Sequence, residues 1–268
     1  MRPVPMNSQQ ILQGVSRSFA LSIRLLPGPL RQQVGLAYLL ARLTDTVADT
    51  TTVAAGQRLS LLGSLQHAIR TPAAHPQLAQ ALRDFARHVP DPHEHALLLR
   101  GQACLEALEA LSPGDQAVVR DVLAAITEGQ AWDLRTLDPP GPGVQTSGDV
   151  DRYTWQVAGS VGEFWTRMCD LHLHGWHGST QADMMQWGAA YGKGLQRLNI
   201  LRDAHSDLHA GRCYFPAEEL AAWGLDAGRL CAAVRAGDRS TLQMLAPLLL
   251  SWQRLTEALL HEGLRYSL

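Results

Sequence analysis

Two short segments of this chain each carry a pair of aspartates one helical turn apart. Asp45 and Asp49 lie in YLLARLTDTVAD, and Asp203 and Asp207 lie in LQRLNILRDAHSDLHAG. On an α-helix, residues i and i+4 share one face and lie about 6 Å apart along the axis. Two carboxylates on one face repel each other and are costly to bury, so each pair needs a cation nearby.

The second segment places further polar groups on the same helix. Asn199, Asp203 and Asp207 follow at i, i+4 and i+8 and form one stripe of oxygen atoms, which we call the α-carboxylate stripe. Oxygen ligands without Cys or His are those that Mg²⁺ selects, and Mg²⁺ completes its shell with water and substrate phosphate oxygens. Arg202 beside the stripe and Arg212 just after a glycine supply planar donors for phosphate. The pattern predicts a diphosphate substrate held with Mg²⁺.

The first pair has an alternative interpretation. Thr44 and residues 50–52 are polar, which is consistent with Asp45 and Asp49 at a solvated helix end. Against this, apolar residues dominate positions 34–43, a pattern that predicts a helix buried on nearly all sides. We therefore expect both carboxylates to have little contact with water.

Other metal and cofactor patterns are excluded. His205 and His209 lie on the opposite side of the helix from the α-carboxylate stripe, so we expect them at the surface. The histidines within residues 172–177 have no second ligand pair at zinc-like spacing. Gly192 and Gly194 lack both a third glycine and a preceding strand, so they do not form a dinucleotide-binding turn.

Composition restricts the class of protein. The 268 residues are 46% hydrophobic, which is enough for a sizeable core, and the net charge of −2 without any basic run argues against a nucleic-acid partner. Four scattered cysteines are typical of reduced thiols in the cytoplasm. No signal peptide is expected, and the longest apolar stretch, at 245–252, is too short to span a bilayer. We expect a cytoplasmic monomer, with peripheral membrane association left open.

Apolar residues recur at spacings of three and four along almost the whole chain, and alternating β-branched runs are absent. This pattern predicts an all-α protein. The expected helices span 7–24, 28–50, 55–70, 75–88, 92–111, 113–136, 149–175, 179–209, 216–223, 226–236 and 239–266. The strongest loop is DPPGPG at 138–143. If the aspartate segments on its two sides share one site, the loop is no domain boundary, and residues 1–268 form a single domain.

Four stretches together resemble the squalene/phytoene synthase family, and most of all its bacterial squalene synthase branch. They are VSRSFALSIRLLP at 15–27, AYLLARLTDTVAD at 37–49, DRYTWQVAGSVGEFW at 151–165 and LQRLNILRDAHSDLHAGRCYFP at 195–216. The resemblance implies a class I isoprenoid (terpenoid) synthase fold, all-α, with a central hydrophobic channel and the two aspartate helices facing each other at its mouth. Family members usually continue beyond this chain, so a C-terminal extension is expected to be missing.

The same resemblance assigns roles to individual residues. The implied Mg²⁺ ligands are Asp45, Asp49, Asn199, Asp203 and Asp207, the four aspartates also counting as catalytic. The implied diphosphate and substrate contacts are Ser16, Arg17, Ser18, Arg42, Gln196, Asn199, Arg202 and Arg212.

Tyr38 and Tyr153 are similar to the family's channel tyrosines, one of which assists proton removal. Alternatively, both are core aromatics with a satisfied hydroxyl. Small residues at 157–162 would let helices approach closely. Ala48 and Ser206 depart from the acidic residues that many relatives have, and Gln130 replaces a common methionine.

The implied activity is prenyl transfer. Two farnesyl diphosphates condense head to head to presqualene diphosphate, with Mg²⁺-assisted loss of diphosphate, and NADPH reduction then gives squalene. One alternative is a relative that stops at presqualene diphosphate or yields hydroxysqualene, dehydrosqualene or phytoene. An alternative of another class is a catalytically silent assembly factor, although such proteins typically lose motif aspartates and this chain retains all four.

Overall fold

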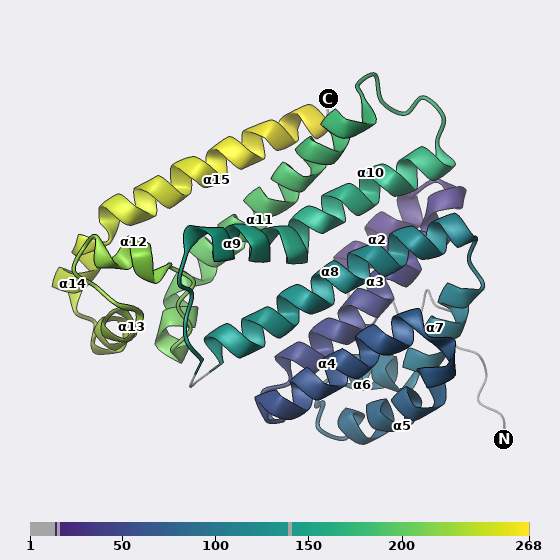
Figure 1. The fold of residues 1–268 in the computed structure, drawn as a ribbon, viewed down its shortest axis with the longest axis horizontal. Helices are drawn as coiled ribbons and strands as arrows, with labels where there is room; N and C mark the ends of the chain where they lie inside the picture. The colour runs from purple at the N-terminus through teal and green to yellow at the C-terminus, as the bar shows by residue number, and fades with distance from the viewer. Residues whose placement is uncertain (1–13, 15–16, 139–140, 268) are drawn as a thin grey trace. The chain divides into compact units, whose positions relative to one another are not determined.

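The computed structural model describes residues 14, 17–138 and 141–267 (Figure 1). Every regular element in these ranges is a helix and none is a strand, which confirms the all-α prediction. The chain divides into two compact units. Unit 1 comprises Met1–Thr127 and Arg167–Trp176, and unit 2 comprises Glu128–Thr166 and His177–Leu268. The single-domain organisation expected from the sequence stays a prediction.

Unit 1 is built from helices whose leucines form its core. Its elements are α2 (Arg17–Leu25), α3 (Gly28–Asp49), α4 (Ala55–Arg70), the 3₁₀ turn η1 (Pro72–Ala74), α5 (His75–Ala86), α6 (Pro92–Leu99), α7 (Gly101–Glu109) and the first part of α8 (Pro113–Leu137). Helix α3 packs against α4 and α7, and α5 packs against α6. Leu43 of α3, Leu62 of α4 and Leu108 of α7 have no exposed surface, so α3 runs through the core.

The sequence predicted one helix over 92–111, but the structure has two, separated at Arg100. A Cβ atom on Gly101 would lie 2.4 Å from Leu82 Cδ1 and 2.9 Å from Leu43 Cδ1. Gly101 thus packs closely against core leucines at the point where α7 begins. The N-cap residue of α6 is Asp91, whose Oδ1 accepts hydrogen bonds from the backbone of His93 (2.8 Å) and Glu94 (2.9 Å).

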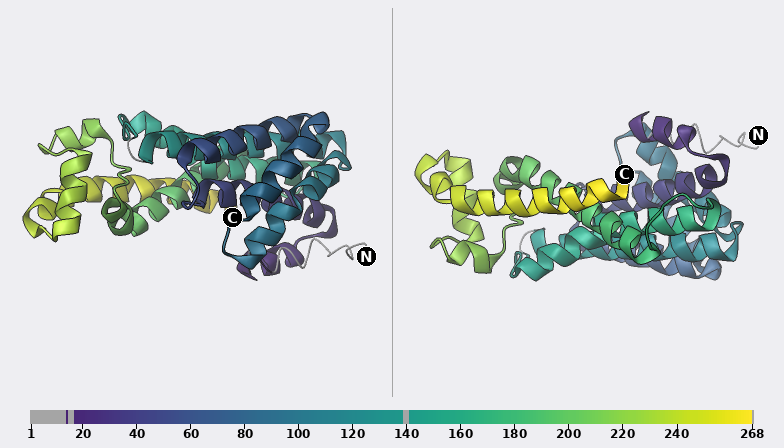
Figure 2. Two further views of the ribbon diagram at one scale, coloured as in Figure 1. Left: turned by 90° about the horizontal axis from the view of Figure 1, so that it is seen from below. Right: turned by 90° about the horizontal axis from the view of Figure 1, so that it is seen from above.

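Unit 2 is organised around one long helix. Its elements are α9 (Ser147–Thr154), the π-helical turn η2 (Trp155–Gly159), α10 (Ser160–His172, which continues into unit 1), α11 (Gln181–Ala210), α12 (Ala217–Ala221), α13 (Ala227–Ala236), α14 (Arg239–Met244) and α15 (Ala246–Ser267). Helix α15 runs alongside α11, as Figure 1 and the right view of Figure 2 show. A single helix was predicted over 239–266. It is interrupted at Leu245, because Pro247 lacks a backbone N–H and suits the first turn of a new helix.

Glycines bring η2 and α10 against α11, as predicted for the small residues at 157–162. A Cβ atom on Gly162 would lie 1.9 Å from the backbone oxygen of Gly188, and one on Gly192 would lie 2.2 Å from that of Ala158. Two helix backbones at this separation leave no room for any side chain. These glycines fix the position of α11, which carries the second aspartate pair.

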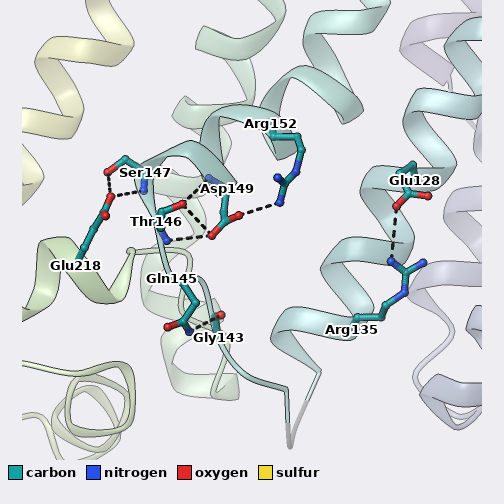
Figure 3. A network of polar contacts seen from close by, with 9 residues as sticks. All are labelled: Glu128, Arg135, Gly143, Gln145, Thr146, Ser147, Asp149, Arg152 and Glu218. Atoms are coloured by element: carbon teal, nitrogen blue, oxygen red, sulfur yellow. Dashed lines mark hydrogen bonds and ion pairs between the residues drawn. The ribbon is translucent and has the colours of Figure 1, made fainter.

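The described residues of the segment 138–143 belong to unit 2, and helix α9 begins further on, at Ser147. Thr146 and Asp149 form a capping box at this helix start, with Asp149 Oδ2 accepting from the backbone of Thr146 at 3.0 Å (Figure 3). The adjacent Ser147 donates its backbone N–H (2.6 Å) and its hydroxyl (2.7 Å) to Glu218 Oε1. This contact ties the start of α12 to the start of α9.

The four cysteines are buried and free, as expected for reduced thiols. Within the described ranges, no helix combines the length and apolar content that crossing a membrane requires.

Candidate active site

The first aspartate pair lies in the last turns of α3. Asp45 is half-buried, whereas Asp49 is the final residue of the helix and is exposed. The expectation that both carboxylates have little contact with water is therefore wrong for Asp49, because the helix ends there. Arg58 fixes this end: it is 5% exposed and its Nη1 atom donates a 2.6 Å hydrogen bond to the carbonyl of Ala48. A guanidinium on a terminal carbonyl is a stabilising helix cap.

Two predicted substrate residues lie further back on α3. Tyr38 is half-buried and stacks on Phe19 of α2, with ring centroids 5.1 Å apart. Arg42 forms an ion pair with Glu94 of α6. A diphosphate bound by Arg42 would thus share its guanidinium with a carboxylate.

The three predicted contacts at the N-terminal segment are placed only in part. Arg17 and Ser18 are the first two residues of α2. Ser16 lies outside the described residues.

The α-carboxylate stripe occupies consecutive turns of α11, and its three residues are half-buried. Asn199 donates its amide nitrogen to Gln196 Oε1 at 3.4 Å, a bond that does not use the Asn199 oxygen. Arg202 binds Asp203 through two parallel bonds, Nε to Oδ1 at 2.8 Å and Nη2 to Oδ2 at 2.6 Å. The hydrogen bond from Arg202 lowers the pKa of Asp203, which keeps the carboxylate ionised.

Asp207 is a half-buried carboxylate whose pKa is shifted by its surroundings. Burial raises its pKa above the usual value, and the charges of Asp203 and Asp133 raise it further, whereas Arg212 acts in the opposite direction. The net pKa is raised, so burial disfavours the ionised form of Asp207 relative to an exposed aspartate.

The end of α11 positions Arg212. Gly211 adopts a left-handed conformation with φ of 91°, and the backbone N–H of Arg212 donates to the carbonyl of Asp207 at 2.8 Å. The Arg212 side chain then reaches α8, where its Nη2 atom lies 2.6 Å from Asp133 Oδ2 and donates to the Tyr214 hydroxyl at 2.9 Å. Tyr214 donates to Asp133 Oδ1 at 2.6 Å, which closes a three-residue network.

Asp133 was not among the residues predicted from the sequence. Its side chain is only 15% exposed, and it lies between Trp132 and Leu134 on α8. A largely buried carboxylate is costly unless it is paired. Its apolar neighbours Trp132 and Leu134 were the available sequence signal, but spacing alone does not identify Arg212 as the partner of Asp133.

Tyr153 is buried between two aromatic rings of the same unit. Its ring lies 5.1 Å from that of Trp132 and 5.6 Å from that of Tyr214, centroid to centroid. Burial raises the pKa of Tyr153 well above its usual value, and the nearby Asp133 charge adds to the effect. The hydroxyl therefore stays protonated at neutral pH, where it can donate and accept hydrogen bonds but does not act as a phenolate base.

The structure sorts the predicted residues into two sets, one within each unit. Unit 1 holds Tyr38, Arg42, Asp45 and Asp49; unit 2 holds Tyr153, Gln196, Asn199, Arg202, Asp203, Asp207 and Arg212. His205 and His209 are exposed, as expected for surface histidines. Among the described residues, no three His, Cys, Asp or Glu side chains gather closely enough to hold a metal ion by themselves. Mg²⁺ commonly takes only one or two carboxylates from a protein and the rest of its shell from water and phosphate.

Comparison with known proteins gives a consistent family. A family model described as squalene/phytoene synthase matches residues 12–267. Squalene synthase ERG9 of Saccharomyces cerevisiae is 29% identical over 81% of this chain and 46% of its own length, and the squalene synthase of Yarrowia lipolytica is 29% identical over 78% and 44%. This chain thus spans about half the length of the curated relatives it matches.

A solved structure supports the same fold. The complex of TcSQS with the ligand BPH1237 superimposes with a TM-score of 0.62 at 26% identity, over 82% of this chain and 60% of that chain. The helical isoprenoid synthase fold expected from the sequence is therefore confirmed, while the bacterial likeness stays a prediction.

Proposed function

Because the chain belongs to the squalene/phytoene synthase family, we propose that it is a prenyltransferase that condenses two farnesyl diphosphates head to head. The product of the first half-reaction is presqualene diphosphate, and the second half-reaction gives squalene with NADPH as the hydride donor. The observation that carries this proposal is the α-carboxylate stripe on α11, with Arg202 bound to it and Arg212 at its end.

The residues of unit 2 fit a diphosphate with Mg²⁺. The stripe offers carboxylate and amide oxygens only, and the pKa of Asp207 is raised mainly by burial, so a nearby cation would stabilise its ionised form. Mg²⁺, when bound, supplies positive charge that stabilises a leaving diphosphate. Asp203 and Asp207 would hold it, with the Asn199 oxygen as a further ligand.

The two arginines of unit 2 are the proposed diphosphate contacts. Each is held in place by a carboxylate, Arg202 by Asp203 and Arg212 by Asp133. These ion pairs orient planar donors before substrate arrives, which reduces the ordering needed on binding. The guanidinium charge then stabilises the negative charge that develops as the C–O bond breaks.

Unit 1 supplies the second proposed set. Asp45 and Asp49 would provide the other Mg²⁺-binding pair, while Tyr38 and Arg42 would contact substrate. For Arg42 this role requires that its ion pair with Glu94 be shared or exchanged. Arg17, Ser18 and Ser16 remain proposed diphosphate contacts by resemblance to the family.

Tyr153 is proposed to act as a neutral hydroxyl. Its raised pKa argues against a phenolate base at neutral pH. A neutral phenol can still donate its O–H to the group that accepts the departing proton, and so hold that group in place. The stack with Trp132 and Tyr214 keeps the ring in one orientation.

The products formed from farnesyl diphosphate and Mg²⁺, with and without NADPH, test the proposal. We expect squalene with NADPH and presqualene diphosphate without it. A hydroxylated C30 product irrespective of NADPH would instead identify a hydroxysqualene synthase, and turnover of geranylgeranyl diphosphate alone would identify a phytoene synthase. No product from either substrate, with a chain extended to the length of its relatives, would support the silent assembly factor.

A further inference from the structure

Helix α2 is apolar on two roughly opposite faces. Ala20 and Ile23 are only 4% and 5% exposed, and α2 packs against α3. Leu21 and Leu25 lie one turn apart on the other face and are 59% and 78% exposed, which makes Leu25 the most exposed large hydrophobic residue that the structure describes. In both views of Figure 2, α2 (purple) lies at an edge of unit 1. Its second apolar face is therefore open to solvent.

Two exposed arginines lie beside these leucines. Arg24 precedes Leu25 in the last turn of α2. Arg31, in the first turn of α3, donates from its Nη2 atom to the carbonyl of Leu26 at 2.9 Å, so its guanidinium is held at the end of α2. We call the surface formed by Leu21, Arg24, Leu25 and Arg31 the α2 face.

The part of the chain that carries the α2 face is positively charged. Residues 1–44 include five arginines and no aspartate or glutamate, although the whole chain has a net charge of −2. Asp115 contacts this end of α3 by accepting from Gln33 at 3.3 Å, but it is only 3% exposed and pairs with His172. The α2 face thus presents positive charge in a chain whose remaining residues are acidic overall. Such an asymmetry is typical of proteins that bind an anionic surface.

The combination of exposed leucines with arginines selects the partner. A nucleic acid offers phosphates to the arginines but little apolar surface to Leu21 and Leu25. A bilayer with anionic headgroups offers both, because leucines can enter the acyl boundary while guanidinium groups stay among the phosphates. We propose that the α2 face docks unit 1 on the surface of an anionic lipid bilayer.

The docking is reversible and lies along the bilayer surface. Helix α2 has nine residues, and its buried face keeps it in unit 1 while the α2 face meets the lipid. Two leucines bury less hydrocarbon than a single acyl chain, which by itself binds a membrane only marginally, so attraction to the two arginines is needed as well. None of the four residues is among the proposed Mg²⁺ or diphosphate contacts, so the inference does not depend on the prenyltransferase activity.

Sedimentation of the whole chain with lipid vesicles, without substrate, tests the proposal. We expect binding to vesicles of phosphatidylcholine mixed with phosphatidylglycerol, and binding about tenfold or more weaker to phosphatidylcholine alone. Leu21→Gln and Leu25→Gln should each weaken binding about tenfold, and Arg24→Gln about fivefold. Leu250→Gln and Arg254→Gln, at exposed positions of α15 in unit 2, are the matched controls and should bind as the parent does. Equal binding to both kinds of vesicle, or losses at the α2 face no larger than at the controls, would overturn the proposal.

A fluorescent label shows whether the leucines enter the bilayer. The four native cysteines are buried, so a thiol-reactive nitrobenzoxadiazole dye should label Leu25→Cys at the new position alone. We expect its emission to shift to the blue when vesicles containing phosphatidylglycerol are added, because the dye moves from water into the acyl boundary. The same dye on Leu250→Cys should not shift. Vesicle binding without a shift at position 25 would show that the protein meets the lipid through another surface, and would overturn the proposal.

Discussion

The guanidinium of Arg212 lies 2.6 Å from the carboxylate of Asp133, although the two residues are 79 positions apart in the sequence. Tyr214 donates to the same carboxylate, so one charge on α8 fixes both an arginine and a tyrosine from the segment that follows α11. The segment after the α-carboxylate stripe therefore has a defined course, and Arg212 is held near Asp207.

Asp133→Asn should destabilise the protein, because it leaves the partly buried guanidinium of Arg212 without a counter-charge. The side chains of Arg212 and Asp133 are 24% and 15% exposed, so we expect about 1–3 kcal/mol, less than for a fully buried pair. Urea unfolding measures the loss. Asp121→Asn is the control, because its pair with Arg167 is more exposed and should contribute under about 1 kcal/mol. Equal losses in the two variants would contradict the role given to Asp133.

Gly192→Ala should separate α11 from η2, because the added Cβ atom would lie 2.2 Å from the Ala158 oxygen. Backbone cannot yield as a flexible side chain can, so a loss of about 1–3 kcal/mol or more is expected. Gly63→Ala, on α4 with nothing within 4 Å of the added atom, should instead stabilise by roughly 0.5–1 kcal/mol. Thermal unfolding shows whether each substitution lowers or raises the melting temperature. A stabilising Gly192→Ala would refute the close approach of the α11 and η2 backbones.

Asp115 should make unit 1 sensitive to acid. Burial raises its pKa, but hydrogen bonds from His172 (2.6 Å), Ser112 (2.9 Å) and Gln33 (3.3 Å) outweigh this effect, and the pKa is lowered from the usual 3.8. A carboxylate with a lowered folded-state pKa stabilises the fold above pH 3.8, and this contribution is lost as the pH falls through the folded-state pKa.

Urea unfolding between pH 7 and pH 2 tests this dependence. Asp115→Asn should be less stable than the parent at pH 7, and the difference should shrink below about pH 4. Asp84→Asn, at an aspartate whose side chain is 53% exposed, should follow the parent throughout. A difference between Asp115→Asn and the parent that is independent of pH would show that packing, not charge, is what the substitution removes.

The helical pattern alone predicted most of the fold. The expected helix at 55–70 is α4, Ala55–Arg70, and those at 28–50 and 179–209 differ from α3 and α11 by one or two residues at an end. The breaks at Arg100 and Leu245 were missed because apolar spacing continues through both, although Gly101 and Pro247, which disfavour a helix interior, lie beside them.

The candidate site was predicted less completely, for a related reason. Spacing on one helix identifies which side chains share a face, and so the stripe of Asn199, Asp203 and Asp207 was found. It does not identify partners from other elements. Glu94, which pairs with Arg42, and Asp133, which pairs with Arg212, came only from the tertiary structure.

Asp203→Asn should reduce Mg²⁺-dependent consumption of farnesyl diphosphate by several orders of magnitude, because it keeps the size of the side chain but removes a charge from the proposed cation site. Asp45→Asn should do the same from unit 1. Initial rates at saturating Mg²⁺ measure both. His205→Asn, at an exposed position on the opposite side of α11, is the control and should match the parent. Parental turnover in both aspartate variants would disprove the proposed cation site.

Tyr153→Phe should lower turnover more than it weakens substrate binding. The substitution deletes one hydroxyl and leaves the ring between Trp132 and Tyr214, so packing is kept while a polar contact is lost. The comparison of kcat with the Kd for a non-reactive diphosphate analogue separates the two effects. Because the pKa of Tyr153 is raised well above its usual value, the parent rate should show no rise from a tyrosine ionisation between pH 7 and 10. A rate that climbs through this range in the parent but not in Tyr153→Phe would instead identify the phenolate as the base, and equal effects on kcat and Kd would make Tyr153 a packing residue.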